Sequence, residues 1–130
     1  IFLLFKNPCL HVDVGQMYEI VGKEYDYCLP RMFFQKGKIL SLNKRIKQGL
    51  GQNLSLSFLK ELKIISLPNS ENEILDATKE IYFLVVENKK FKDSKLRKSA
   101  KKNFINNNLT PFNISRIIEK KYKNFFVNQN

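Results

Sequence analysis

The sequence of 130 residues predicts an α/β fold with a small parallel sheet. Two stretches carry this prediction: an apolar strand at residues 9–14, and a strand followed at once by an amphipathic helix at residues 64–87. Further helical segments separate and follow them, and strands that alternate with helices are typical of parallel sheets. Hydrophobic residues make up 43% of the chain, which is enough for a buried core in a single domain.

The strongest local signal lies in residues 64–87. An apolar run at residues 64–67 ends at Pro68. Ser70 and Glu73 have the spacing of a capping box, in which the hydroxyl and the carboxylate each accept a hydrogen bond from a backbone amide at the start of a helix. Apolar positions then recur at three- and four-residue steps, and we expect this stripe to face the core: Ile74, Thr78, Ile81, Tyr82 and Val85.

The other predicted elements are shorter. Ser41 is a candidate cap for a helix at residues 42–49. Residues 88–102 predict a strongly basic helix with a solvated face, and residues 115–126 predict a final helix. Residues 16–28 show neither the helical nor the strand period, so we expect a loop there.

The beginning of the chain is also informative. Residues 1–5 are apolar and predict either the end of a helix or a buried strand, and they are too short to cross a bilayer. The first residue is Ile rather than Met, so we expect a further segment to precede it. Two strands are too few for a parallel sheet, and we expect that segment to hold the others.

The formal net charge of +11 has two interpretations. It can indicate an anionic partner such as a nucleic acid, a nucleotide or a membrane surface. It can also reflect composition, because the chain is rich in Lys, Asn, Ile and Phe, which AT-rich coding sequence favours. Only four of the 23 basic residues are Arg, the residue type that best reads phosphates and bases, so we expect no specific nucleic-acid partner.

Cysteine usage and motifs exclude several classes of site. The two cysteines, Cys9 and Cys28, do not make a disulfide framework, which favours a reducing cytoplasm. With a single His there is no zinc-ligand spacing, and we expect no metal. The sequence contains no glycine-rich phosphate loop and no serine nucleophile elbow.

Three polar residues are candidates for a site. His11 and Asp13 are two residues apart on a predicted strand, so they should point to the same side. They lie at its carboxyl end, where parallel α/β sheets bind ligands. Arg31 follows Pro30 in an apolar segment and could hold a phosphate or a carboxylate. The alternative interpretations are a hydrogen-bonded strand end for the first two and a surface ion pair for Arg31.

Four segments together resemble the C-terminal part of bacterial glycosyltransferases of surface-carbohydrate synthesis that have the two-Rossmann-domain, GT-B architecture. They are residues 5–10 (FKNPCL), 29–33 (LPRMF) with 40–46 (LSLNKRI), 69–74 (NSENEI), and 114–115 (IS) with 125–126 (FF). They cover most of the chain in the same order. The resemblance implies a partial Rossmann-like domain, with residues 1–87 as its α/β part and residues 88–130 as extra C-terminal helices.

The resemblance also implies a function. Such an enzyme moves a sugar from a nucleotide-sugar to a glycan or lipid-linked acceptor, usually without a bound metal or another cofactor, and works in the cytoplasm or at the inner membrane surface. In this chain His11, Asp13 and Arg31 would line the donor cleft, and Arg31 would neutralise the phosphate charge. Two alternatives are a small basic nucleic-acid-binding module and a Rossmann-like domain without catalytic activity.

Overall fold

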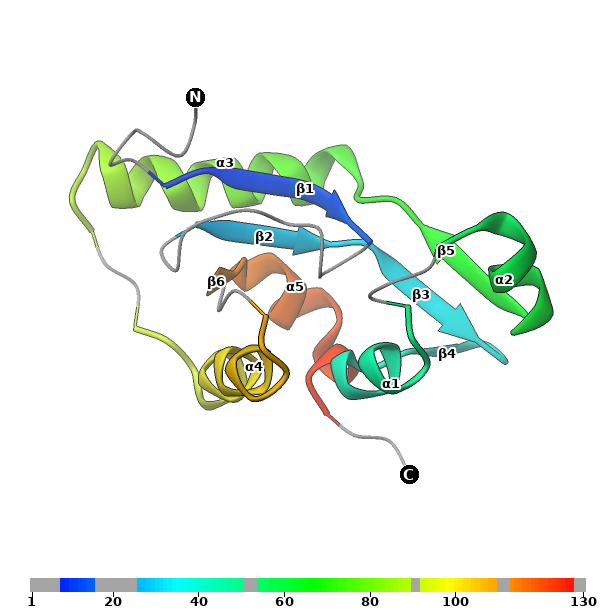
Figure 1. The fold of residues 1–130 in the computed structure, drawn as a ribbon. Coiled ribbons are helices and arrows are strands. Elements are labelled where there is room, and N and C mark those ends of the chain that lie inside the picture. Colours follow the sequence, from blue (N-terminus) through cyan, green and yellow to red (C-terminus); the bar gives the residue numbers. More distant parts are fainter. Residues whose placement is uncertain (1–7, 16–25, 51–53, 90–91, 110–112, 128–130) are drawn as a thin grey trace.

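The computed structural model describes residues 8–15, 26–50, 54–89, 92–109 and 113–127 (Figure 1). The expectations for residues 1–5 and for most of the loop at 16–28 fall outside these ranges. The described residues form a mixed α/β structure. Its elements in chain order are β1 (Leu10–Val14), β2 (Tyr27–Pro30), β3 (Met32–Gln35), β4 (Lys38–Ile39), α1 (Leu42–Lys47), α2 (Leu56–Glu61), β5 (Ile64–Leu67), α3 (Glu71–Val85), α4 (Lys95–Asn106), β6 (Asn113–Ile114), α5 (Arg116–Lys121) and the 3-10 helix η2 (Lys123–Phe125).

Strands β1, β2 and β6 form a parallel sheet with β2 in the centre. Leu10 pairs with Tyr27, and Cys28 pairs with Ile114. The predicted strand at residues 9–14 and the predicted small parallel sheet are confirmed. The sequence did not predict β2, because all four of its residues are buried and it lacks the alternation of a half-exposed strand. Strand β6 has only two residues, too few for any period.

Strands β4, β3 and β5 form a second sheet, which is antiparallel. The predicted strand at residues 64–67 is confirmed as β5, but its expected place in the parallel sheet is wrong. Only Arg31 separates β2 from β3, so the chain enters the second sheet without a helix in between. A turn at Lys36 and Gly37, both with positive φ, then leads into β4. Apolar patterning predicts a strand but not the direction of its neighbour.

Serine side chains cap four of the helices. The hydroxyl oxygens of Ser41, Ser55, Ser70 and Ser94 each accept a hydrogen bond from a backbone amide three residues later. The capping box of Ser70 and Glu73 is present as predicted. The basic helix is shorter at its start than expected, because it begins after the Ser94 cap. The predicted final helix ends at Lys121 and is followed by η2, since Tyr122 leaves the helical region with φ of −128°.

The predicted buried face of α3 is confirmed only in part: Ile74 is half-buried and packs against the main core cluster. Thr78, Tyr82 and Val85 of the apolar stripe are exposed, whereas Glu73, Ala77 and Glu80 are buried. Helix α3 packs on β1, β2 and α5, with Ala77 fully buried. The two glutamates that flank it reach basic partners on other elements, which makes their burial possible.

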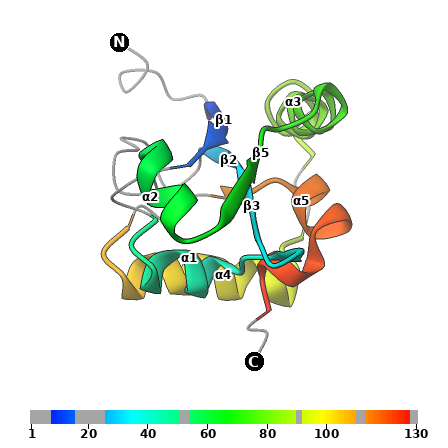
Figure 2. The same ribbon diagram turned by 90° about the vertical axis from the view of Figure 1, so that its right-hand side faces the viewer.

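The hydrophobic core has two parts. The main cluster joins the parallel sheet to the helices and includes Cys28, Leu29, Phe104, Ile114 and Ile118. The second cluster lies between the antiparallel sheet and α2 and contains Phe33, Leu40, Leu50, Leu59 and Ile64. Figure 2 shows α2 on one side of the strands and α3 and α5 on the other. Within the described ranges, no helix is long and apolar enough to cross a membrane.

Candidate functional site

His11 and Asp13 are held at different ends of the parallel sheet. His11 Nε2 lies 3.2 Å from Oδ2 of the buried Asp26, which immediately precedes β2. Asp13 exchanges two hydrogen bonds with Asn69: its amide donates to Asn69 Oδ1 (2.7 Å), and the Asn69 amide donates to Asp13 Oδ1 (2.9 Å). The side chain of Asn69 also donates to the carbonyl of Pro30, the last residue of β2. His11 therefore contacts the amino edge of the sheet and Asp13 contacts its carboxyl edge.

An irregularity in β1 accounts for this separation. The pairing of β1 with β2 shifts register between His11 and Val14, and Asp13 has a φ of 58°. Regular alternation would place both side chains on one side, but a bulge interrupts the alternation. Neither its position nor the positive φ was visible in the sequence pattern.

Arg31 lies at the carboxyl edge beside the buried Arg45 of α1. The Arg31 amide donates to the carbonyl of Val14 (2.9 Å). The Arg45 guanidinium donates to the carbonyls of Arg31 (2.9 Å), Gly15 (3.2 Å) and Val14 (3.5 Å). It also lies over the Phe33 ring, 4.6 Å from its centroid. Burial lowers the pKa of Arg45 to about 10. Arg45 therefore ties α1 to the ends of β1 and β2.

Two of the four segments quoted above converge at this carboxyl edge, one of them with both of its parts. Asn69 begins the segment 69–74, Arg31 belongs to 29–33, and Arg45 belongs to 40–46. The contacts of Asn69 with Pro30, and of Arg45 with Arg31, join them directly. In the described part of the chain, the Nε atoms of both arginines are buried without a hydrogen-bond partner.

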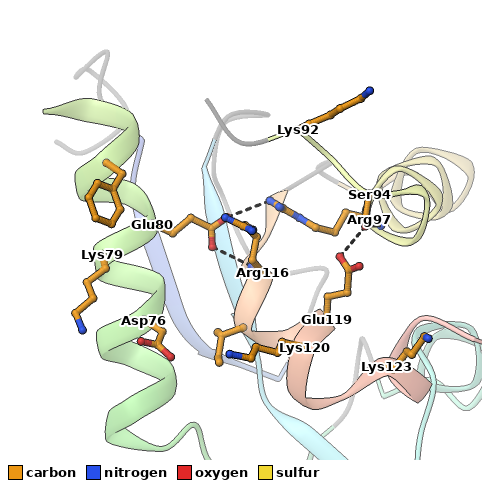
Figure 3. Close-up of a pocket in the computed structure, with 12 residues that line it drawn as sticks. Asp76, Lys79, Glu80, Lys92, Ser94, Arg97, Arg116, Glu119, Lys120 and Lys123 are labelled. Carbon is orange, nitrogen blue, oxygen red and sulfur yellow. Dashed lines mark hydrogen bonds and ion pairs between the residues drawn. The ribbon is translucent and has the colours of Figure 1, made fainter. Parts of the chain in front are cut away.

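A second candidate site is a cleft between α3, α5 and the start of α4, which we call the basic cleft (Figure 3). It has a volume of about 780 Å³. Among the residues that the structure describes, six basic side chains line it, against three carboxylates. The basic residues are Lys79, Lys92, Arg97, Arg116, Lys120 and Lys123.

The floor of the basic cleft is built on Glu80. Its Oε1 lies 3.2 Å from the guanidinium of Arg97, and both side chains are buried. Its Oε2 accepts hydrogen bonds from the Ser115 hydroxyl and the Arg116 amide, both at 2.9 Å, at the start of α5. Burial raises the pKa of the Tyr27 phenol, and the nearby charge of Glu80 adds to this effect.

The remaining contacts leave the cleft with an excess of positive charge. Glu119 accepts a hydrogen bond from the Ser94 hydroxyl at 2.6 Å (Figure 3). Arg97 also lies 3.5 Å from Asp93, yet its Nε is buried without a hydrogen-bond partner among the described residues. Two of the three lining carboxylates, Glu80 and Glu119, are thus engaged by protein groups, and most of the basic side chains are exposed. The cleft is suited to an anionic ligand.

None of His11, Asp13 and Arg31 lines the basic cleft. The sequence pattern alone did not mark Glu80 and Arg97 as site residues. Glu73, Ala77 and Glu80 have the spacing of one helical face, and this spacing could have identified Glu80. Such a face is buried only if its two glutamates have basic partners. Arg97 was included in a run of charges expected to be solvated. Two of the four arginines, Arg45 and Arg97, are buried in contacts within the protein.

Comparison with known proteins found no matching family model, no matching curated protein and no matching solved structure. Over the residues that the structure describes, no group of three or more His, Cys, Asp or Glu side chains is placed to hold a metal ion.

Proposed function

We propose that the chain is part of a glycosyltransferase that moves a sugar from a nucleotide-sugar donor to a surface-glycan acceptor. The observation that carries this proposal is the basic cleft, whose volume of about 780 Å³ and excess of lysine and arginine suit a nucleoside diphosphate. The resemblance of the four segments to GT-B transferases supplies the reaction. The meeting of two of these four segments at the carboxyl edge of a parallel sheet supports it, because α/β folds bind ligands at that edge.

The transfer leaves negative charge on the departing nucleoside diphosphate, and this charge explains why the cleft would need basic side chains. The bond between the anomeric carbon of the sugar and the diphosphate oxygen breaks, and a new bond forms to an acceptor hydroxyl, which loses its proton. The nucleoside diphosphate leaves with the bonding electron pair and gains negative charge. Exposed cations of the basic cleft such as Lys120 and Lys123 would stabilise that charge.

The buried Arg97 gives the cleft a preorganised element. Its side chain is fixed by Glu80 and Asp93, so little conformational entropy would be lost when a phosphate approaches. The exposed lysines, by contrast, must be ordered on binding. Because only 4% of Arg97 is exposed, we expect it to fix the shape of the cleft floor and the exposed lysines to contact the diphosphate.

Calorimetric titration of the chain with UDP-sugars and GDP-sugars tests the proposal. We expect saturable binding of one of these donors, competition by the matching nucleoside diphosphate, and no binding of the free sugar. Lys120→Ala should weaken binding about tenfold, since it removes one charged contact to phosphate. Lys98→Ala is the matched control, because Lys98 is an exposed lysine of α4 that does not line the cleft.

Two results would contradict the proposal. One is the lack of binding of either class of donor by the folded chain. The other is equal loss of affinity in both lysine variants, which would indicate attraction to overall charge instead of the cleft. Tight binding of single-stranded DNA that displaces the nucleotide would favour the nucleic-acid module.

A further inference from the structure

A second cavity, which we call the hollow, lies between the hairpin of β3 and β4 and the residues that follow α5. It has a volume of about 820 Å³. Phe34, Ile39 and Tyr122 supply its apolar lining, and each is half-buried and packs against the main core cluster. Phe34 and Ile39 are paired across β3 and β4, so their side chains point to the same side of that sheet. The apolar lining of the hollow is therefore continuous with the folded core.

The rest of the hollow is basic. Lys38, Lys121 and Lys123 line it, and no carboxylate lines it within the described ranges. Lys121 is already engaged, since its Nζ lies 2.7 Å from Oε1 of Glu73 and 5.2 Å from the centroid of the Tyr122 ring. Lys38 and Lys123 are exposed and form no ion pair with any residue that the structure describes. Two cations are therefore open to a ligand.

The hydrogen-bonding groups of the hollow favour an anion over a neutral ligand. Lysine ammonium groups donate hydrogen bonds and accept none. In the described lining, the only side-chain acceptors are the Asn124 amide oxygen and the Tyr122 hydroxyl. A neutral polyhydroxyl compound needs acceptors for its hydroxyl protons, whereas a carboxylate or a phosphate offers acceptors to the lysines. The apolar side chains beside the lysines match an apolar body attached to that anionic group.

We propose that the hollow is a second binding site, for a small organic anion that joins a carboxylate or a phosphate to a flat apolar body. The anionic group contacts Lys38 and Lys123, and the apolar body lies against Phe34, Ile39 and Tyr122. A cavity of this volume, with apolar walls and a few polar groups, is typical of sites for small molecules.

Lys123 connects the hollow to the basic cleft, because it lines both. One ammonium group cannot give its full attraction to an anion on each side, so ligands in the two sites should weaken each other's binding. This coupling rests on the proposed function, because it needs a nucleoside diphosphate in the cleft. Binding of an organic anion in the hollow does not.

Titration of the full chain followed by amide NMR tests the proposal, with phenyl phosphate, phenylacetate, inorganic phosphate and benzyl alcohol as probes. We expect phenyl phosphate and phenylacetate to shift the resonances of Gly37, Lys38 and Asn124 until saturation. Phenyl phosphate should bind about tenfold more tightly than inorganic phosphate, because its ring is removed from water. Benzyl alcohol should not bind. The affinities of the two aryl anions identify whether the hollow prefers phosphate or carboxylate.

Lysine variants separate the two sites. Lys38→Ala should weaken phenyl phosphate binding at these resonances about tenfold and leave nucleotide binding unchanged. Lys120→Ala should have the reverse effect, because Lys120 lines only the basic cleft. Lys123→Ala should weaken both ligands. Lys60→Ala is the matched control, because Lys60 is exposed on α2 and lines neither cavity.

The proposal is overturned if neither aryl anion shifts the resonances of the hollow. It is also overturned if inorganic phosphate or benzyl alcohol binds as tightly as phenyl phosphate, since one part of the ligand is then not recognised. Equal weakening by Lys38→Ala and Lys60→Ala would indicate attraction to overall charge and would overturn it too. If a saturating nucleoside diphosphate leaves the affinity for phenyl phosphate unchanged, the coupling through Lys123 is wrong. Binding of the aryl anion without binding of any nucleotide would contradict only the proposed function.

Discussion

Glu80 of α3 and Arg97 of α4 form an ion pair in which both side chains are buried, with 3.2 Å between Oε1 and the guanidinium nitrogen. The second oxygen of Glu80 binds Ser115 and the Arg116 amide, so one carboxylate joins α3, α4 and α5. Arg97 and Ser115 are buried, so water cannot readily take the place of the carboxylate beside them if it is lost.

We predict that Glu80→Gln destabilises the protein by about 3 kcal/mol, the lower end for breaking a buried pair, because the buried Arg97 then keeps only Asp93, 3.5 Å away and partly exposed, as a counter-charge. Urea unfolding followed by circular dichroism measures this loss. Glu87→Gln is the control, as Glu87 is exposed and pairs only with its neighbour Lys89 among the ion pairs described. The double variant Glu80→Gln with Arg97→Met should be more stable than Glu80→Gln alone. A loss below about 1 kcal/mol, the size of an exposed pair, would contradict the assignment.

Arg45 leads to a second prediction. Arg45→Lys keeps the charge but cannot reach the carbonyls of Val14, Gly15 and Arg31 together, so we expect a loss of about 2 to 3 kcal/mol. Chemical denaturation checks this value, and Lys44→Arg, at the exposed neighbouring position of α1, should change stability little. If Arg45→Lys were as stable as the native chain, the guanidinium geometry would not matter for joining α1 to the strand ends.

Glu73 leads to a prediction on pH. Its burial on its own raises the pKa, but hydrogen bonds from Lys121 and from the Ser70 amide outweigh burial and hold the pKa below its usual value. The stability from this shift is fully present above the unfolded-state pKa of glutamate, about 4.3, and is lost as the pH falls through the lower folded pKa.

Unfolding curves measured at pH values from neutral into this acidic range test the pH prediction. Glu73→Gln should be less stable than the native chain at neutral pH, and the difference should shrink as the pH falls through the folded pKa. Glu71→Gln serves as the comparison, because Glu71 lies in the same turn but is exposed. The prediction fails if the difference between native chain and Glu73→Gln is the same at every pH.

The sequence predicted the elements whose signals are local. The capping box at Ser70 and Glu73, the cap at Ser41, and the strands β1 and β5 all depend on neighbouring residues, and all are present. The strand that pairs with β5 is β3, which lies more than 25 residues earlier in the chain. No pattern within β5 encodes this pairing.

Part of the buried face of α3 was mispredicted for a related reason. Hydrophobic periodicity assumes that charged residues face water, but Glu73 and Glu80 face inward because Lys121 and Arg97 meet them there. The candidate site was likewise foreseen only as separate residues. Asp13 and Arg31 do lie at the carboxyl edge, whereas His11 contacts Asp26 because a bulge interrupts the alternation of β1. The basic cleft forms only where three helices meet.

The single residue between β2 and β3 has a mechanical consequence. Arg31 is fixed at both of its peptide groups, since its amide is bound by Val14 and its carbonyl by Arg45. Turning one sheet against the other would have to twist the chain at this point and break both bonds. These two hydrogen bonds therefore oppose rotation of one sheet against the other at their junction.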